Sequence, residues 1–341
     1  MDDQPHITVT ALGNSGSGKT TFLLGMYAIM SAGLNGYFLN APDQDVDLQL
    51  AARWERLLDD GELPPPNPGE MISYSFDFLD GLQRLLGIDW LDYRGGALSD
   101  ARGSESEDVP VLHERLAGSD SVYLVLDGSY LVDPVRHATR GAILRETGLR
   151  RMTSLLQGSV QQRIANGAPP PSLVVLVTKS DLVPPARRQR MEDIVDDIQR
   201  LLPICFQEGF TTLICPVQLG EFGQKPPDRV PAGLIGPQRL HYPIVFSLAE
   251  YMRLLSLAAA EAANEARLRK REAEDALRDL RRTLFGRGRM RDAEAGLLAA
   301  QDEEHDMNTV REIAEGRAKR LYEELPSRLP MFRDGHEVLS W

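Results

Sequence analysis

Residues 6–31 of the chain, HITVTALGNSGSGKTTFLLGMYAIMS, contain the segment that decides the fold. The first part, His6–Leu12, alternates along its length and is rich in β-branched side chains, which predicts a β-strand. Glycines interrupt the pattern from Gly13 to Gly18, and Lys19–Ser31 then has the composition of a helix. The segment therefore predicts a strand, a glycine-rich turn and a helix in direct succession.

The turn fits the pattern G-x-x-x-x-G-K-[ST] at every fixed position, as Gly13-Asn14-Ser15-Gly16-Ser17-Gly18-Lys19-Thr20. Glycines let backbone N–H groups turn inward around a phosphate, because no Cβ stands in the way. Lys19 supplies a cation between the β- and γ-phosphates, and the hydroxyl of Thr20 can ligate Mg²⁺. The N-terminus of the following helix adds its positive end. We expect these residues, with Thr21 beside them, to bind a nucleoside triphosphate.

Strand and helix patterns alternate along the next part of the chain. The predicted strands are 71–79, 86–91, 121–126, 173–177 and 211–215, and the predicted helices are 109–116, 138–165 and 184–202. Leu173–Val177 is entirely apolar, as expected for a parallel strand that is buried on both faces. This alternation predicts an α/β fold with helices on both faces of the sheet.

Beyond residue 240 the composition changes. Ile244–Phe285 has no helix breaker and is rich in Ala, Leu, Glu and Arg, which predicts one helix about 60 Å long at 1.5 Å per residue. Gly286-Arg287-Gly288 interrupts this helix, and Met290–Leu325 is helical again, so a helical hairpin follows the α/β part. The predicted domains are a phosphate-loop domain at 1–240, with an insert at 33–70, and a C-terminal hairpin at 241–341 that could be a coiled coil.

Composition and charge limit the partners and the compartment. The 341 residues carry 50 acidic and 38 basic side chains, a formal net charge of −12, which disfavours nucleic acid as a partner. No signal-peptide layout is present at the N-terminus, and no apolar run approaches the roughly 20 residues needed to span a bilayer. Cys205 and Cys215 lack a His or Cys cluster, so we expect free thiols. We expect a cytoplasmic protein without a membrane span.

Two further motifs follow predicted strands. Asp92-Tyr93-Arg94-Gly95 follows 86–91 as D-x-x-G, where an aspartate can hold Mg²⁺ through water and the glycine N–H can reach the γ-phosphate. Thr178-Lys179-Ser180-Asp181 follows 173–177. The carboxylate of Asp181 can accept both N1–H and the 2-amino N–H of guanine, which adenine does not present. The three motifs in this order favour GTP, and an ATP-using enzyme is the less favoured alternative.

In residues 6–220 these motifs resemble those of the Ras-like GTPases of the TRAFAC class, in particular divergent bacterial members. The resemblance implies a Ras-like P-loop NTPase sheet and a bound GTP or GDP with Mg²⁺. It implies that Lys19 and Thr20 bind phosphate and metal, and that Asp92 and Gly95 form a second switch. Hydrolysis would then be in-line attack of water on the γ-phosphate, stabilised by Lys19, Mg²⁺ and backbone amides.

The same resemblance implies which residues bind the base. Thr178, Lys179 and Asp181 would read guanine, and the aliphatic stem of the lysine would cover the ring. Val217 and Gln218 fall where the family places a loop whose backbone contacts the guanine oxygen, although their side chains match that loop poorly.

Departures from the family pattern concern hydrolysis. No threonine lies between Thr21 and Thr139, so the switch threonine that closes on Mg²⁺ and the γ-phosphate has no counterpart, and Asn67 is the polar substitute in that region. The glutamine after D-x-x-G is replaced by Gly96. Arg94 is a candidate for phosphate contact, with a solvated or acid-paired arginine as the alternative. We expect slow hydrolysis, and a hydrolysis-dead GTP-binding scaffold is the alternative.

These features together predict a switch that signals to a protein partner. The nucleotide would set the exposure of residues 33–70 and 93–108, and the C-terminal helices would act as effector. Those helices either pack only within their own hairpin or present a surface to a partner protein or to a second copy of the chain. The run Asp43, Asp45 and Asp47 is expected to begin a helix rather than to bind calcium.

Overall fold

The computed structural model describes residues 5–64, 72–92, 108–223, 229–282 and 287–338. The chain divides into two compact units, Met1–Ser247 with Leu325–Trp341, and Leu248–Glu324. This division differs from the predicted boundary, because the C-terminal residues belong to the first unit. The reason is strand pairing: β10 (Met331–Arg333) lies antiparallel to β7 (Thr211–Pro216) and extends its sheet.

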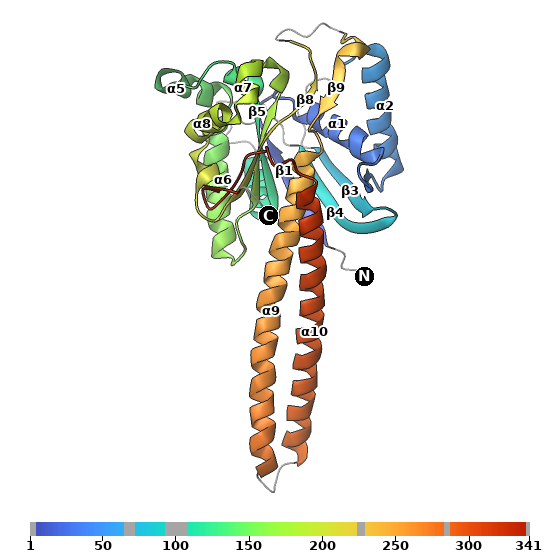
Figure 1. Ribbon diagram of the computed structural model, residues 1–341, viewed down its shortest axis with the longest axis vertical. Coiled ribbons are helices and arrows are strands. Elements are labelled where there is room, and N and C mark those ends of the chain that lie inside the picture. The colour runs from blue at the N-terminus through green and yellow to red at the C-terminus, as the bar shows by residue number, and fades with distance from the viewer. Residues whose placement is uncertain (1–4, 65–71, 93–107, 224–228, 283–286, 339–341) are drawn as a thin grey trace. The chain divides into compact units, whose positions relative to one another are not determined.

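The first unit is built on a mixed sheet (Figure 1). In the described residues the strand order is β11-β10-β7-β6-β5-β1-β4-β3-β2. The parallel strands are β1 (His6–Leu12), β4 (Gln83–Asp92), β5 (Ser121–Asp127), β6 (Ser172–Thr178) and β7. The antiparallel strands at the edges are β2 (Tyr37–Asn40), β3 (Ile72–Asp80), β10 and β11 (His336–Glu337). The apolar runs of β5 and β6 are buried, as expected for central strands.

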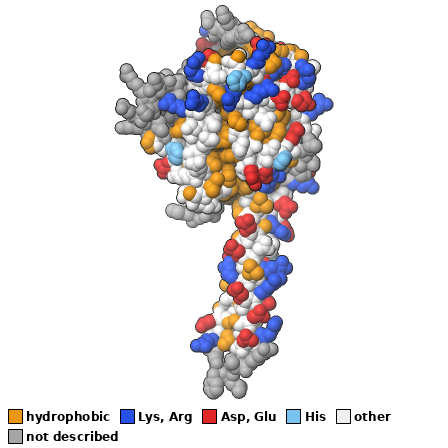
Figure 2. Space-filling model, turned by 90° about the vertical axis from the view of Figure 1, so that its left-hand side faces the viewer, with side chains coloured by type: hydrophobic (Ala, Val, Ile, Leu, Met, Phe, Trp, Pro, Cys, Tyr) orange, Lys and Arg blue, Asp and Glu red, His pale blue; other side chains and the backbone are white. Residues whose placement is uncertain are grey.

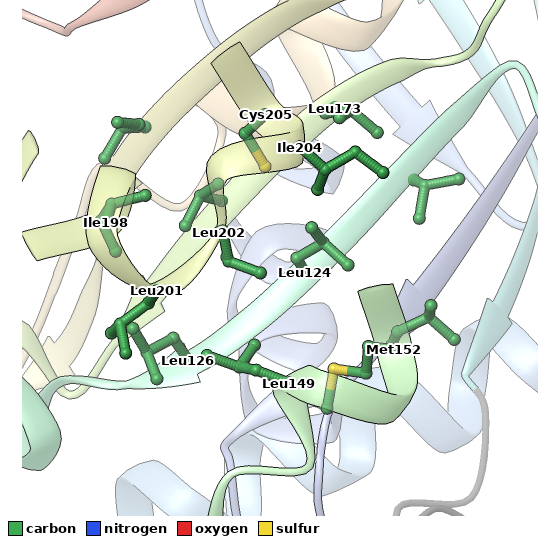
Figure 3. Packing of buried hydrophobic residues seen from close by; sticks show 14 of the residues in the cluster. Leu124, Leu126, Leu149, Met152, Leu173, Ile198, Leu201, Leu202, Ile204 and Cys205 are labelled. Atoms are coloured by element: carbon green, nitrogen blue, oxygen red, sulfur yellow. The ribbon is translucent and has the colours of Figure 1, made fainter. Parts of the chain in front are cut away.

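One face of the sheet carries the main core cluster. The helices that contribute to it are α4 (Asp108–Gly118), α6 (Leu149–Ala165) and α8 (Met191–Leu201). Leu124 and Leu126 of β5 point to this face and pack with Leu149 and Met152 of α6 and with Ile198 of α8 (Figure 3). All five side chains are fully buried, so this face is closed to solvent.

The opposite face is covered by α1 (Lys19–Ser31) and by the beginning of α9 (Tyr242–Arg282). Tyr123, which alternates with Leu124 along β5, lies here: its ring centroid is 6.2 Å from that of Phe22. The hydroxyl of Ser247 lies 3.0 Å from that of Tyr123 and 2.8 Å from that of Ser121. The fold is therefore α/β with helices on both faces of a phosphate-loop sheet, as predicted.

Two predicted helices are interrupted. The helix expected at 138–165 is divided into α5 (His137–Glu146) and α6, because Gly148 has a φ of 70°. The helix expected at 184–202 is divided into α7 (Pro185–Gln189) and α8 at Arg190. The aspartate run begins a helix as expected: the side chain of Asp43 accepts the N–H of Asp45 at the start of α2 (Gln44–Asp60).

A buried carboxylate, that of Asp197 in α8, connects α7, α8 and the segment before α5. Asp197 is 1% exposed and accepts the N–H of Val135 at 2.9 Å. It also accepts from the guanidinium of Arg187, itself 7% exposed, and from Arg200 at 3.0 Å. Arg187 and Val135 are both buried, so loss of the carboxylate would leave the Arg187 guanidinium without its counter-charge and the Val135 N–H without its acceptor.

The second unit is an antiparallel helical hairpin, formed by α9 from Leu248 onward and by α10 (Arg287–Glu323). Arg269 pairs with Glu303 at 2.8 Å and Lys270 with Glu304 at 3.0 Å. Alanine is frequent at its buried positions, as at 259, 263, 266, 300, 314 and 318. Charges of both signs alternate along its surface (Figure 2).

One described helix segment, Tyr242–Leu280, contains an 18-residue window whose mean hydropathy of 1.3 would suit a membrane span. Of that window 61% is buried inside the protein, as in the core helix of a soluble protein. Length and composition alone do not separate these two kinds of helix.

Candidate functional site

The predicted motifs meet at one edge of the sheet, where the parallel strands end. Asp127 at the end of β5 lies opposite Thr178 at the end of β6, and Ala11 of β1 lies opposite Asp92 at the end of β4. Ligands of open α/β sheets bind outside the carboxyl ends of the strands. The fold therefore brings together segments that are far apart in the sequence.

The phosphate loop has the backbone that its glycines require. Gly16 and Gly18 have φ values of 74° and 88°, a region that disfavours side chains. A Cβ at Gly13 would lie 2.7 Å from the hydroxyl of Ser17 and 2.9 Å from Cβ of Val125. The Ser17 hydroxyl is buried and has no hydrogen-bond partner among the described residues. A phosphate oxygen in the loop would satisfy this donor.

The charged pair beneath the loop fits a metal–triphosphate complex. Lys19 is 8% exposed and donates to the carbonyls of Gly13 at 2.7 Å and Asn14 at 3.1 Å. Burial lowers the pKa of Lys19, and the Asp92 carboxylate opposes that shift. Burial raises the pKa of Asp92, and this rise is opposed by the charge of Lys19 and by a 2.8 Å hydrogen bond from the hydroxyl of Thr20. Burial thus disfavours the charged form of both groups, which an anion near Lys19 and a cation near Asp92 would stabilise.

Mg²⁺ suits the oxygen donors at this position. The described residues contain no group of three or more His, Cys, Asp or Glu side chains that could hold a metal ion. Mg²⁺ needs no such cage, because it is usually bound by one or two protein oxygens together with phosphate and water. The hydroxyl of Thr20 and the carboxylate of Asp92 provide two adjacent oxygens.

The third motif contacts the phosphate loop directly. The hydroxyl of Thr178 donates to the carbonyl of Ser17 at 2.6 Å. The ammonium of Lys179 donates to the carbonyl of Gly16 at 2.9 Å and to Asp127 at 2.5 Å. Asp127 was not among the predicted site residues, although it ends a buried strand as Asp92 does.

The backbone of Lys179 is held in an unusual conformation. Its φ is 48°, one of four positive values among the described residues other than glycine. Such a conformation costs about 1–3 kcal/mol and persists only where the surroundings impose it. Two neighbours hold the backbone here. A Cβ at Gly128 would lie 2.7 Å from the Lys179 carbonyl, so the two backbones pack closely, and Ser180 N–H donates to the carbonyl of Val217 at 3.1 Å.

A pocket of about 460 Å³ opens beside the phosphate loop and is large enough for a nucleoside. Residues from the predicted set that line it are Gly18, Thr21, Thr178, Lys179, Asp181, Val217 and Gln218. Lining residues outside that set include Leu63, Asp127, Leu219, Phe222 and Leu240. No local motif marks the four apolar side chains among them, because they come from separate parts of the chain.

The remaining predicted residues are placed less directly. Val217 N–H donates to the carbonyl of Val177 at 2.8 Å, so this amide already has an acceptor. Asn14 donates through its side chain to the carbonyl of Glu146 at 2.5 Å, and Ser15 is exposed. Three predicted residues, Asn67, Arg94 and Gly95, lie outside the residues that the structure describes.

A scan against models of protein families finds no match to this sequence, and a search of curated protein sequences finds none either. Solved structures align with parts of this chain. A crystal structure of sup35 complexed with GDP covers 71% of this chain and 45% of its own, at 16% identity and a TM-score of 0.31. The Ski7 GTPase-like domain of S. cerevisiae, bound to GDP and inorganic phosphate, covers 62% and 43%, at 14% identity and a TM-score of 0.33.

The signal recognition particle receptor complex SRb-GTP/SRX from Chaetomium thermophilum covers 62% of this chain and 93% of its own, at 14% identity and a TM-score of 0.32. This chain thus spans less than half the length of the sup35 and Ski7 chains. All three are described with GTP or GDP. At these TM-scores the likeness decides nothing about this chain, whose chemistry depends on the residues above.

Proposed function

We propose that this protein is a guanine-nucleotide-binding switch that binds GTP or GDP with Mg²⁺, hydrolyses GTP slowly and signals to a protein partner. The observation that supports this most is that the second and third motifs both contact the phosphate loop, beside one pocket. Lys179 joins the phosphate loop to the third motif at 2.9 Å, and Thr20 joins it to Asp92 at 2.8 Å. Asp181 lines the pocket beside the loop, together with Gly18 and Thr21.

Each segment would have a separate task in this site. The phosphate loop and Lys19 would bind the β- and γ-phosphates, while Asp181 would accept the two N–H donors on the edge of guanine. Mg²⁺ held at Thr20 and Asp92 would neutralise charge on the phosphates. Lys19 would stabilise the negative charge that develops as water attacks the γ-phosphorus and the bond to the β-phosphate breaks.

Identification of the nucleotide tests the proposal. Mass spectrometry of the denatured, freshly purified protein should detect GDP or GTP, and calorimetry with Mg²⁺ should give tighter binding of GDP than of ADP. Lys19→Ala should weaken GTP binding strongly, because it removes the buried cation. Lys319→Ala, at an exposed position of α10, is the matched control and should bind as the parent does. Equal affinity for ADP and GDP would contradict the guanine assignment and favour the ATP-using alternative.

Hydrolysis should be slow, because the sequence has neither the switch threonine nor the glutamine after D-x-x-G. Unassisted turnover is expected on the order of 10⁻⁴–10⁻² s⁻¹. Phosphate release measured in a single-turnover assay checks this value. A rate of several per second would mean that another residue positions the water, and Arg94→Ala would be the first variant to test. No release above the Lys19→Ala background would instead favour the hydrolysis-dead scaffold.

The partner is proposed to read the nucleotide state through residues 33–70 and 93–108 or through the helical hairpin. Light scattering with GDP and with a GTP analogue would test self-association through these surfaces. A nucleotide-dependent dimer would make a second copy the partner. A monomer in both states would leave a different protein as the partner.

A further inference from the structure

A small hairpin covers one side of the proposed base pocket. It consists of β8 (Gln218–Gly220) and β9 (Ile235–Gln238), which pair antiparallel, and it lies beside α1 and α2 (Figure 1). Resting on the proposed function, we propose that this hairpin is a clamp for the base. In it the ring of Phe222 stacks on the base, and the N–H of Phe222 holds the carboxylate of Asp181 in place.

The ring of Phe222 is positioned before any ligand binds. It is half-buried and lines the pocket. A Cβ at Gly220 would lie 2.5 Å from Cε1 of Phe222, so the ring packs directly over that glycine. The same Cβ would lie 2.1 Å from the carbonyl of Leu234, which accepts Glu221 N–H at 3.0 Å. Because Gly220 has no side chain, the ring of Phe222 and the carbonyl of Leu234 can both lie close to its Cα.

The backbone of Phe222 contacts the residue proposed to read the base. Its N–H donates to Oδ2 of Asp181 at 3.2 Å. A carboxylate can accept further hydrogen bonds while it holds this one. The contact limits rotation of the carboxylate and leaves it facing the pocket that both residues line. Recognition of the base edge and stacking on the base face thus depend on one loop.

The clamp is anchored on two sides within the first unit. A Cβ at Gly25 of α1 would lie 2.6 Å from a methyl of Leu240 and 2.9 Å from one of Leu219, so these side chains pack against the helix. Between β8 and β9, Val230 N–H donates to the carbonyl of Gly61 at 2.8 Å. That bond ties the clamp to the end of α2, two residues before Leu63, which also lines the pocket.

Stacking and edge recognition predict different behaviour in variants. Every base has an aromatic face, so loss of stacking weakens binding of all bases by a similar factor. Phe222→Ala is expected to weaken GDP binding about 5- to 150-fold while changing the preference for GDP over ADP less than threefold. Phe222→Leu, which keeps an apolar side chain but has no aromatic face, should weaken GDP binding by a smaller factor than Phe222→Ala. Leu82→Ala, at a fully exposed position between β3 and β4, is the matched control.

Phe222→Trp supplies an independent test of position. Guanine stacked on the indole should quench its fluorescence, measured as the change beyond that of the parent, which contains Trp54, Trp90 and Trp341. Quenching by GDP together with the affinity loss in Phe222→Ala would support the clamp. Phe222→Ala with parental affinity, or Phe222→Trp without extra quenching, would overturn it while guanine binding by the parent protein still stands. A parent protein that binds no guanine nucleotide would overturn both proposals, and if Phe222→Ala does not fold, Phe222→Leu and Phe222→Trp decide.

Discussion

Replacement of Asp181 by asparagine should change which base the protein prefers. The carboxylate offers two acceptors to the two N–H donors of guanine, whereas asparagine offers one acceptor and one NH₂ donor. The new donor would face the 2-amino group of guanine, and one charge-assisted hydrogen bond, worth about 1.5–3 kcal/mol, would be lost. Asp181→Asn should therefore bind GDP about 10- to 150-fold more weakly than the parent.

The same substitution should improve binding of a xanthine nucleotide, because xanthine carries a carbonyl where guanine carries the 2-amino group. The new amide can donate to that carbonyl while its oxygen accepts N1–H. Calorimetry of XDP, GDP and ADP with Mg²⁺, for the parent and for Asp181→Asn, measures the exchange of preference. Asp133→Asn makes the same chemical change at an exposed position and should leave all three affinities unaltered. An unchanged ratio of GDP to XDP affinity in Asp181→Asn would refute the assignment of Asp181 to the base edge.

Four further outcomes are expected. Replacement of residues 254–318 by a short Gly-Ser loop should preserve GDP affinity in calorimetry, because it keeps both the start of α9 that packs on the sheet and the strand that returns to it; loss of binding in a folded variant would assign the hairpin to the site. Asp197→Ala should lower the free energy of unfolding, measured in urea, by about 3–5 kcal/mol, because it leaves the buried guanidinium of Arg187 without its counter-charge. A decrease below about 1 kcal/mol would contradict that account. Burial lowers the pKa of His241 to about 4, so the contribution of neutral His241 to stability is fully present above pH 6.5 and is lost as the pH falls from 6.5 towards 4. The Tm of His241→Gln should therefore fall less than the Tm of the parent over that range, and an equal fall would mean that other groups cause it. Cys205 and Cys215 are free and buried, and burial raises the pKa of both, that of Cys215 to about 12, so a thiol reagent at pH 8 should react with neither before unfolding.

The sequence was most informative where a local pattern has only one physical solution. The glycines of the phosphate loop, followed by Lys19 and Thr20, permit the turn and the helix start that the structure contains. The apolar runs at the centre of the sheet could be recognised because strands buried on both faces need no polar positions. Asp92 could be proposed as a site residue because it directly follows a predicted strand, and Asp181 because it stands in the Thr178–Asp181 motif that follows the apolar run 173–177.

Other features depend on contacts between distant segments, which no local pattern records. The break at Gly148 was not predicted, because a glycine within a helical pattern is often tolerated. Strand β10 is three residues long and becomes a strand only because the edge of β7 accepts it. Phe222 has no motif around it, and its place in the pocket follows from packing over Gly220 and from pairing of the hairpin. The sequence by itself thus determined the phosphate loop and the order of the central elements, since these depend on local backbone conformation and side-chain periodicity. The walls of the base pocket were decided only by the tertiary structure, because they come from loops that meet after the sheet has formed.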